Sequence, residues 1–172
     1  MADTESLLSI LRSFEWHVVL RPSASFLPIE VRRRYPRLPE NVESFLSSIE
    51  VCTNKDETVW FLTQRDYGAN RDGMFRWNEH ELMCLDAAGG DNEEEERVRA
   101  FWSRHFPFMF AVHSDYDYLA VDLSPEAYGQ IVHGYMPEPE QTSLVARSFS
   151  EFVLMFTETF RGKANYPLTL FK

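Results

Sequence analysis

Three apolar segments follow one another in the second half of the chain, with only short polar connections between them. Residues 107–113 read PFMFAVH and are almost continuously apolar. Residues 117–123 read DYLAVDL, in which large aliphatic residues alternate onto one face, and residues 129–135 read GQIVHGY. Such patterns are typical of strands, and short connections join antiparallel neighbours. The sequence therefore predicts an antiparallel meander, which strongly restricts the folds that the chain can adopt.

Segments with apolar residues at helical spacing lie on both sides of this meander. Capping residues mark several of their starts, such as Asn78 followed by Glu81 and Ser148 followed by Glu151. The predicted helices lie within residues 4–14, 37–49, 78–90, 91–106 and 148–162, and two further strands are predicted within 16–22 and 57–64. In the last helix we expect Phe152 and Phe156 to be buried.

These elements predict an α+β fold in which an antiparallel sheet is flanked by several helices. The length of 172 residues fits a single domain spanning residues 1–172, and 44% hydrophobic residues suffice for a core. The cysteines, Cys52 and Cys84, are too far apart for a CxxC motif, and no signal peptide is recognised. No apolar run approaches the roughly 20 residues that span a bilayer. We therefore expect a reduced, cytoplasmic protein without a membrane role.

The formal net charge is −10, and nearly all of the negative excess falls after residue 50. Nucleic-acid binding draws most of its affinity from Lys and Arg, so this balance argues against a nucleic-acid partner. It suits a basic protein partner, although a negative surface also serves solubility alone.

A run of glutamates at the start of a predicted helix is the strongest candidate for contact with a cationic partner. The same run is favourable for helix electrostatics, which is the alternative interpretation. The run consists of Glu93, Glu94, Glu95 and Glu96. We expect Tyr67 and Tyr128 to be exposed in loops, where they would supply aromatic anchors for an interface.

The segment HSDYDYLAVDLS concentrates polar groups between two predicted strands. Asp115 and Asp117 bracket Tyr116 at the predicted hairpin tip, where aspartate stabilises turn geometry. All three are also candidates for partner contact. A third interpretation, a metal or general-base site, would add His113 and Asp122.

Two further groups allow a functional and a structural interpretation. His80 and Cys84 are four residues apart on one helix face, which suits zinc or a Cys–His nucleophile, but no second ligand pair exists. The alternative is a core Cys84 beside an exposed His80. The basic run 32–37, RRRYPR, allows a phosphate or acidic-peptide site, a solvated surface, or ion pairs with the glutamate run. No common catalytic or cofactor motif is present, so no cofactor is expected.

Four motifs in order resemble the SUKH superfamily of Smi/Knr-like domains. They are LPENVESFL, YLAVDLS, GQIVHGY and VARSFSEFVLMF, and they span residues 38–156. The resemblance implies an α+β fold without a catalytic constellation. Many bacterial members are similar to immunity proteins that neutralise polymorphic toxins, often nucleases, and a fungal member regulates cell-wall synthesis. The chain departs from the pattern at IEVCTNKDE, where the family has an Asn-Gly-Gly-like turn, and at SDYD, where glycines are common.

The resulting prediction is a non-enzymatic protein-binding domain, namely a bacterial immunity protein that binds a basic toxin domain. The first alternative is an adaptor or regulator of the same fold that binds a cellular protein or peptide. A weaker alternative is a metal-dependent hydrolase built on His113, Asp115, Asp117 and Asp122.

Overall fold

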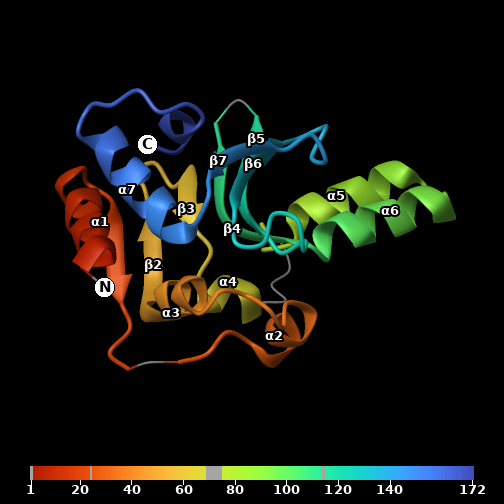
Figure 1. The fold of residues 1–172 in the computed structure, drawn as a ribbon, viewed down its shortest axis with the longest axis horizontal. Helices are drawn as coiled ribbons and strands as arrows, with labels where there is room; N and C mark the ends of the chain where they lie inside the picture. The colour runs from red at the N-terminus through yellow and green to blue at the C-terminus, as the bar shows by residue number, and fades with distance from the viewer. Residues whose placement is uncertain (1, 24, 69–74, 114) are drawn as a thin grey trace.

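A seven-stranded antiparallel sheet, with its strands in sequence order from β1 to β7, forms the centre of the molecule (Figure 1). The structure is a computed structural model, and it describes residues 2–23, 25–68, 75–113 and 115–172. The three strands of the predicted meander are confirmed as β4, β5 and β6. The strands are β1 (His17–Leu20), β2 (Ile49–Thr53), β3 (Val59–Phe61), β4 (His105–Val112), β5 (Tyr116–Asp122), β6 (Ile131–Tyr135) and β7 (Ser143–Ala146).

Helices cover this sheet, and the fold is α+β as predicted. The five predicted helices are present, and two short helices, α2 and α4, were not predicted. The described helices are α1 (Ala2–Ser13), α2 (Ile29–Arg34), α3 (Glu40–Ser48), α4 (Gln64–Gly68), α5 (Glu79–Ala88), α6 (Asn92–Trp102) and α7 (Phe149–Phe160), with a 3-10 turn at Leu168–Phe171.

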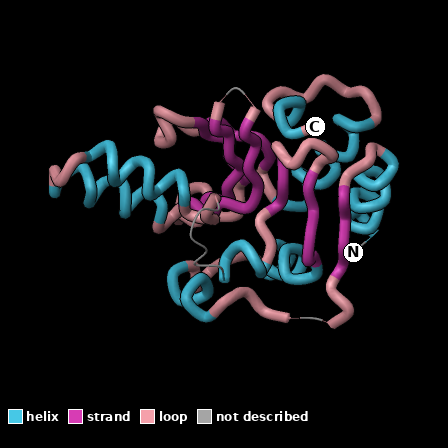
Figure 2. The backbone as a smooth tube through the Cα atoms, turned by 180° about the vertical axis from the view of Figure 1, so that it is seen from behind, coloured by secondary structure: helices cyan, strands magenta, loops and turns pink. Residues whose placement is uncertain are grey.

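Two pairs of packed helices lie on opposite sides of the molecule, and the shorter helices α2, α3 and α4 lie along its lower edge in Figure 1. Helix α1 packs against α7 beside the first strands, so elements near the two ends of the chain are neighbours. Helices α5 and α6 pack against each other and extend away from the body as a helical hairpin (Figures 1 and 2). The sheet therefore has helices on both of its faces.

Strand β4 explains why its sequence is apolar without alternation. It is buried along all but its last residue. On one face Phe108 packs against Phe152 of α7, with ring centroids 5.3 Å apart, and on the other Phe110 packs 4.6 Å from the ring of His80 in α5. A strand covered on both faces needs apolar residues at every position.

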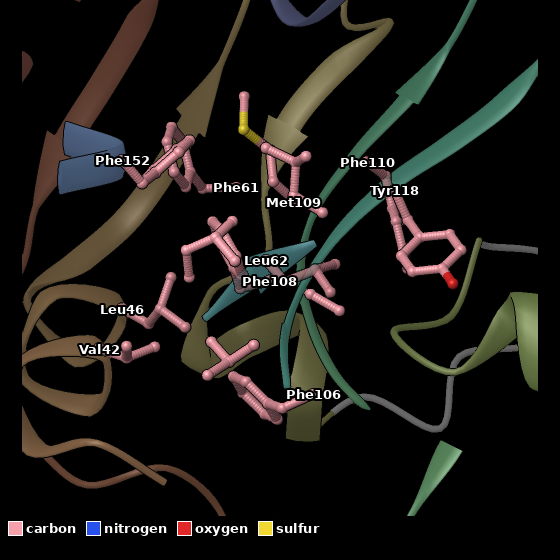
Figure 3. Packing of buried hydrophobic residues seen from close by; sticks show 14 of the residues in the cluster. Val42, Leu46, Phe61, Leu62, Phe106, Phe108, Met109, Phe110, Tyr118 and Phe152 are labelled. Atoms are coloured by element: carbon pink, nitrogen blue, oxygen red, sulfur yellow. The ribbon is translucent and has the colours of Figure 1, made fainter. Parts of the chain in front are cut away.

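The core that results is rich in aromatic rings (Figure 3). Phe152 and Phe156 of α7 are fully buried, as predicted, and Phe152 lies beside Phe61 of β3. Ser148 caps α7 by accepting a hydrogen bond from the Glu151 amide, again as predicted. The closing helix is thus fixed both at its start and along its apolar face.

Candidate functional site

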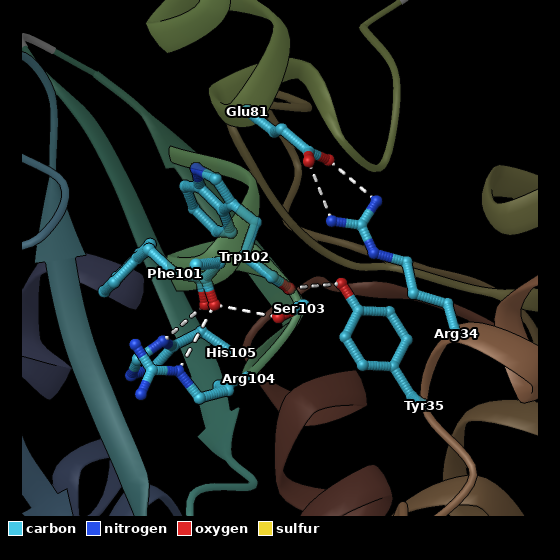
Figure 4. A network of polar contacts seen from close by, with 9 residues as sticks. Arg34, Tyr35, Glu81, Phe101, Trp102, Ser103, Arg104 and His105 are labelled. Atoms are coloured by element: carbon cyan, nitrogen blue, oxygen red, sulfur yellow. Dashed lines mark hydrogen bonds and ion pairs between the residues drawn. The ribbon is translucent and has the colours of Figure 1, made fainter. Parts of the chain in front are cut away.

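The α5–α6 hairpin is attached to the body by a partly buried ion pair between α2 and α5. Both guanidinium nitrogens of Arg34 donate to the Glu81 carboxylate at 2.8 Å (Figure 4). Burial lowers the pKa of Arg34, but the hydrogen bonds to Glu81, together with the electrostatic attraction of Tyr35 and Glu81, outweigh burial and leave the pKa raised. Next to this pair, Tyr35 Oη donates to the Trp102 carbonyl at 2.8 Å, and burial raises the pKa of Tyr35 well above its ordinary value. A bidentate pair of this kind fixes both position and orientation.

This ion pair corrects two expectations from the sequence. Asn78 stands at the N-cap of α5 without a side-chain capping bond, and Glu81 binds Arg34 instead of closing a capping box. The partner of the basic run is Glu81, not the glutamates at the start of α6. Two other arginines of the run also contact their own chain: Arg32 donates to the Leu27 carbonyl, and Arg37 donates to the Leu123 carbonyl.

At the hairpin between β4 and β5 the predicted polar tip is only partly exposed. Asp115 and Tyr116 are exposed, as predicted. The expectation of an exposed Asp117 is wrong: its side chain is buried, and its Oδ1 lies 2.7 Å from Nε2 of His133. Strand β5 begins at Tyr116, so Asp117 is already a strand residue and shares its face with Leu119.

The four residues of the metal hypothesis are not brought together. Asp122 pairs in register with His105, at the opposite end of the β4–β5 ladder from His113 and Asp115. Asp117 and Asp122 are five residue steps apart along the strand, a span of about 16 Å. Within the described ranges, no group of three or more His, Cys, Asp or Glu residues is arranged to hold a metal ion.

His80 is buried in an aromatic cage, so the expectation of an exposed His80 is wrong. Its ring is 1% exposed and packs against Phe110 and Tyr118. Burial lowers the pKa of His80 to about 4, although a 3.2 Å contact of Nε2 with the Tyr116 carbonyl opposes the shift. Cys84 is buried, as expected, and burial raises the pKa of its thiol. A nucleophilic cysteine requires the opposite shift.

The predicted tyrosine anchors do not form one surface. Tyr67 lies in α4 and not in a loop, and it is buried, with its hydroxyl donating to the Pro107 carbonyl at 2.8 Å; the expectation of exposure is therefore wrong. Tyr128 is 49% exposed, and its hydroxyl donates to the Arg37 carbonyl. It lies in the β5–β6 connection, about 20 Å along β5 from Tyr116.

The glutamate run forms the first turn of α6, at the outer end of the helical hairpin. Asp91 caps the helix by accepting from the amides of Glu93 and Glu94. Glu95 forms an ion pair with Arg99 at 2.8 Å, and Glu94 forms one with Arg97. Glu93 and Glu96 are exposed and Glu94 and Glu95 half-buried.

A pocket of about 490 Å³ lies between this hairpin and the β6–β7 connection. Its apolar lining includes Ala87 and Val98 from the hairpin and Met136 and Pro139 from the connection. Three carboxylates also line it, from Glu94, Glu138 and Glu140. The sequence pointed to Glu94 as a candidate, whereas no candidate was proposed within residues 136–143, MPEPEQTS. Two glutamates that each follow a proline, Glu138 and Glu140, were the available signal.

The geometry can be compared with known proteins at this point. A family model described as the SMI1 / KNR4 family (SUKH-1) matches residues 33–155. The chain belongs to the SMI1/KNR4 family. The matched segment begins in α2 and ends within α7, so it includes the α5–α6 hairpin, the meander and the pocket of this SMI1/KNR4 chain. A search of the curated proteins finds no match.

The family match confirms the resemblance recognised from the four sequence motifs. In the part of the chain that the structure describes, no helix combines the length and the apolar character needed to cross a bilayer.

Proposed function

We propose that this SMI1/KNR4 chain is a non-enzymatic, single-domain immunity protein that neutralises a basic toxin domain by direct binding. Family membership carries the proposal, because the resemblance implies proteins that capture toxins and have no catalytic constellation. The negative charge supports a basic partner, since complementary charge speeds association and suppresses wrong partners.

The contacts and exposure of the polar side chains also support binding over catalysis. Asp117 and Glu81 are engaged with His133 and Arg34, and the Cys84 thiol has a raised pKa. Tyr116, Tyr128 and the α6 glutamates remain accessible at the surface. A partner that contacts both the tip of the β4–β5 hairpin and the α5–α6 hairpin would contact Tyr116 and the α6 glutamates. Tyr128 would lie outside that interface.

The alternative proposal is an adaptor or regulator that binds a cellular protein. The acidic surface suits both functions, so the partner distinguishes them. A neighbouring gene that encodes a toxin with a basic nuclease domain favours the immunity function.

The decisive experiment expresses the neighbouring gene product with and without this chain. We expect the toxin alone to arrest growth, co-expression to restore growth, and the two purified proteins to co-elute in size-exclusion chromatography. Growth arrest despite co-expression, together with separate elution, would contradict the immunity function.

The contribution of the α6 run is tested separately by stopped-flow association. Changing all of Glu93, Glu94, Glu95 and Glu96 to Gln should slow association with the toxin and weaken its salt dependence. The matched control changes four other exposed glutamates, Glu30, Glu40, Glu50 and Glu126, to Gln, so that the net charge changes equally. If the two variants associate at the same rate, the α6 run has no specific role and only the total charge matters.

A further inference from the structure

The pocket between the α5–α6 hairpin and the β6–β7 connection has two walls that are each held in place by hydrogen bonds. On the strand side, Tyr118 Oη donates to the Pro139 carbonyl at 2.5 Å, and the Met136 amide donates to the Tyr116 carbonyl at 3.0 Å. On the helix side, the Arg34–Glu81 pair holds α5 to the body. The opening is therefore formed before any partner arrives, which reduces the entropic cost of binding.

The charges of the pocket are not balanced internally. Glu138 and Glu140 are exposed on the β6–β7 connection, and no salt bridge within the described residues involves either carboxylate. Glu94 is already paired with Arg97 on its own helix. None of the lining residues is a lysine or an arginine. Two carboxylates are thus available for a cation from outside.

The remaining lining is apolar and selects the shape of that cation. Ala87, Val98, Met136 and Pro139 offer a surface for methylene groups. An aliphatic side chain alone would cover that surface but would desolvate the carboxylates without a partner, which is costly. A metal ion would use the carboxylates but leave the apolar lining uncovered. A flexible apolar stem that ends in a cation satisfies both parts.

We propose that this pocket receives an arginine or lysine side chain of a protein partner. The stem lies on the apolar lining, and the head group pairs with Glu138 and Glu140. The inference rests on the proposed function, because it names the chemistry by which a basic partner is recognised. Arginine is the better fit, since a planar guanidinium pairs with carboxylates bidentately.

The test titrates the ¹⁵N-labelled full chain with the tripeptide acetyl-Gly-Arg-Gly-amide and follows amide chemical shifts. We expect the shifts to cluster around Val98, Met136 and Gln141. The lysine tripeptide should bind at the same place, and the citrulline tripeptide, which has the arginine shape without its charge, should bind about fivefold more weakly. Equal binding of arginine and citrulline, or shifts confined to the first turn of α6, would overturn the proposal.

Variants separate the two parts of the pocket. Changing Glu138 and Glu140 together to Gln should weaken the arginine tripeptide about fivefold and leave the citrulline tripeptide unchanged. Ala87→Phe, at an exposed helix position, should fill the pocket and weaken both peptides. The control changes Glu50 and Glu126, two exposed glutamates outside the pocket lining, together to Gln and should change the binding of neither peptide. An effect of this control equal to that of the Glu138/Glu140 variant would show that only net charge matters and would overturn the pocket assignment.

The outcomes also distinguish this inference from the function on which it rests. If the chain co-elutes with the toxin and restores growth, and the Glu138/Glu140 variant does so with unchanged affinity, the pocket assignment fails while the immunity function stands. If no toxin is bound but the arginine tripeptide occupies the pocket, the immunity function fails while the cation-binding chemistry of the pocket stands.

Discussion

Replacing Gly134 of β6 with alanine tests how the sheet supports the pocket. A Cβ at this position would lie 2.6 Å from Cε1 of Tyr118 and closer still to Cζ and Oη. The tyrosine has no room to withdraw, because it is fully buried and packs against Trp102 and His80. Its hydroxyl also holds the Pro139 carbonyl. We expect Gly134→Ala to lower the free energy of unfolding by about 3 kcal/mol, at the upper end of ordinary overpacking.

Urea denaturation followed by circular dichroism measures this loss. The matched control is Gly68→Ala in α4, where the added Cβ would meet only the Pro28 Cγ at an ordinary 3.6 Å, and where we expect a change within about 1 kcal/mol.

A double-mutant cycle identifies the clash as the cause. Tyr118→Ala alone should cost about 4 kcal/mol, and the double variant should cost about 2 kcal/mol less than the sum of the single changes, because the new methyl group then has space. A Gly134→Ala protein within about 0.5 kcal/mol of the parent, or strict additivity in the cycle, would refute the reasoning.

The remaining predictions concern the buried histidine and the closing helix. Burial lowers the pKa of His80 from 6.5 to about 4, so between these pH values the unfolded chain binds a proton that the folded chain excludes. The free energy of unfolding should therefore be at its full value above pH 6.5 and fall by about 3 kcal/mol as the pH is lowered to 4. His80→Gln should flatten this part of a denaturation profile, whereas exposed His113→Gln should not, and equal slopes would contradict the assignment. In the same assay, Phe156→Ala should lower the free energy of unfolding by about 4 kcal/mol. Leu154 is 53% exposed on the same helix, so Leu154→Ala should lower it by well under half as much. Similar losses for the two variants would mean that α7 does not cover the core as described.

The sequence was most informative where a periodic apolar pattern coincided with burial. The meander and the five longer helices have such patterns, and all were predicted. Strand β2 was missed because it begins at Ile49, directly after α3, with no turn residue to mark the change. Strand β7 has only four residues and follows a proline-containing loop. The helices α2 and α4 are equally short, and their places depend on tertiary contacts rather than on local propensity.

Candidate site residues were harder to predict because exposure depends on partners that are distant in sequence. Tyr67 is buried through contacts with Pro107 and Phe106, and His80 through contacts with Phe110 and Tyr118. No pattern near either residue reveals those neighbours. The pocket was missed for the same reason, since its two walls come from segments that only the folded chain brings together.

The sequential strand order has a consequence for how the chain reaches its folded state. Each strand pairs with strands adjacent in sequence, and short connections join β2 to β3 and β4 through β7, so these pairings close at a small entropic cost. The β1–β2 and β3–β4 connections are longer and carry helices. The packing of α1 on α7 instead joins segments separated by most of the chain. We therefore expect this contact to form last and to open first, with the α1 amides exchanging with solvent before those of β4 and β5. The hairpins of the sheet then form first, and folding is completed when α1 docks on α7.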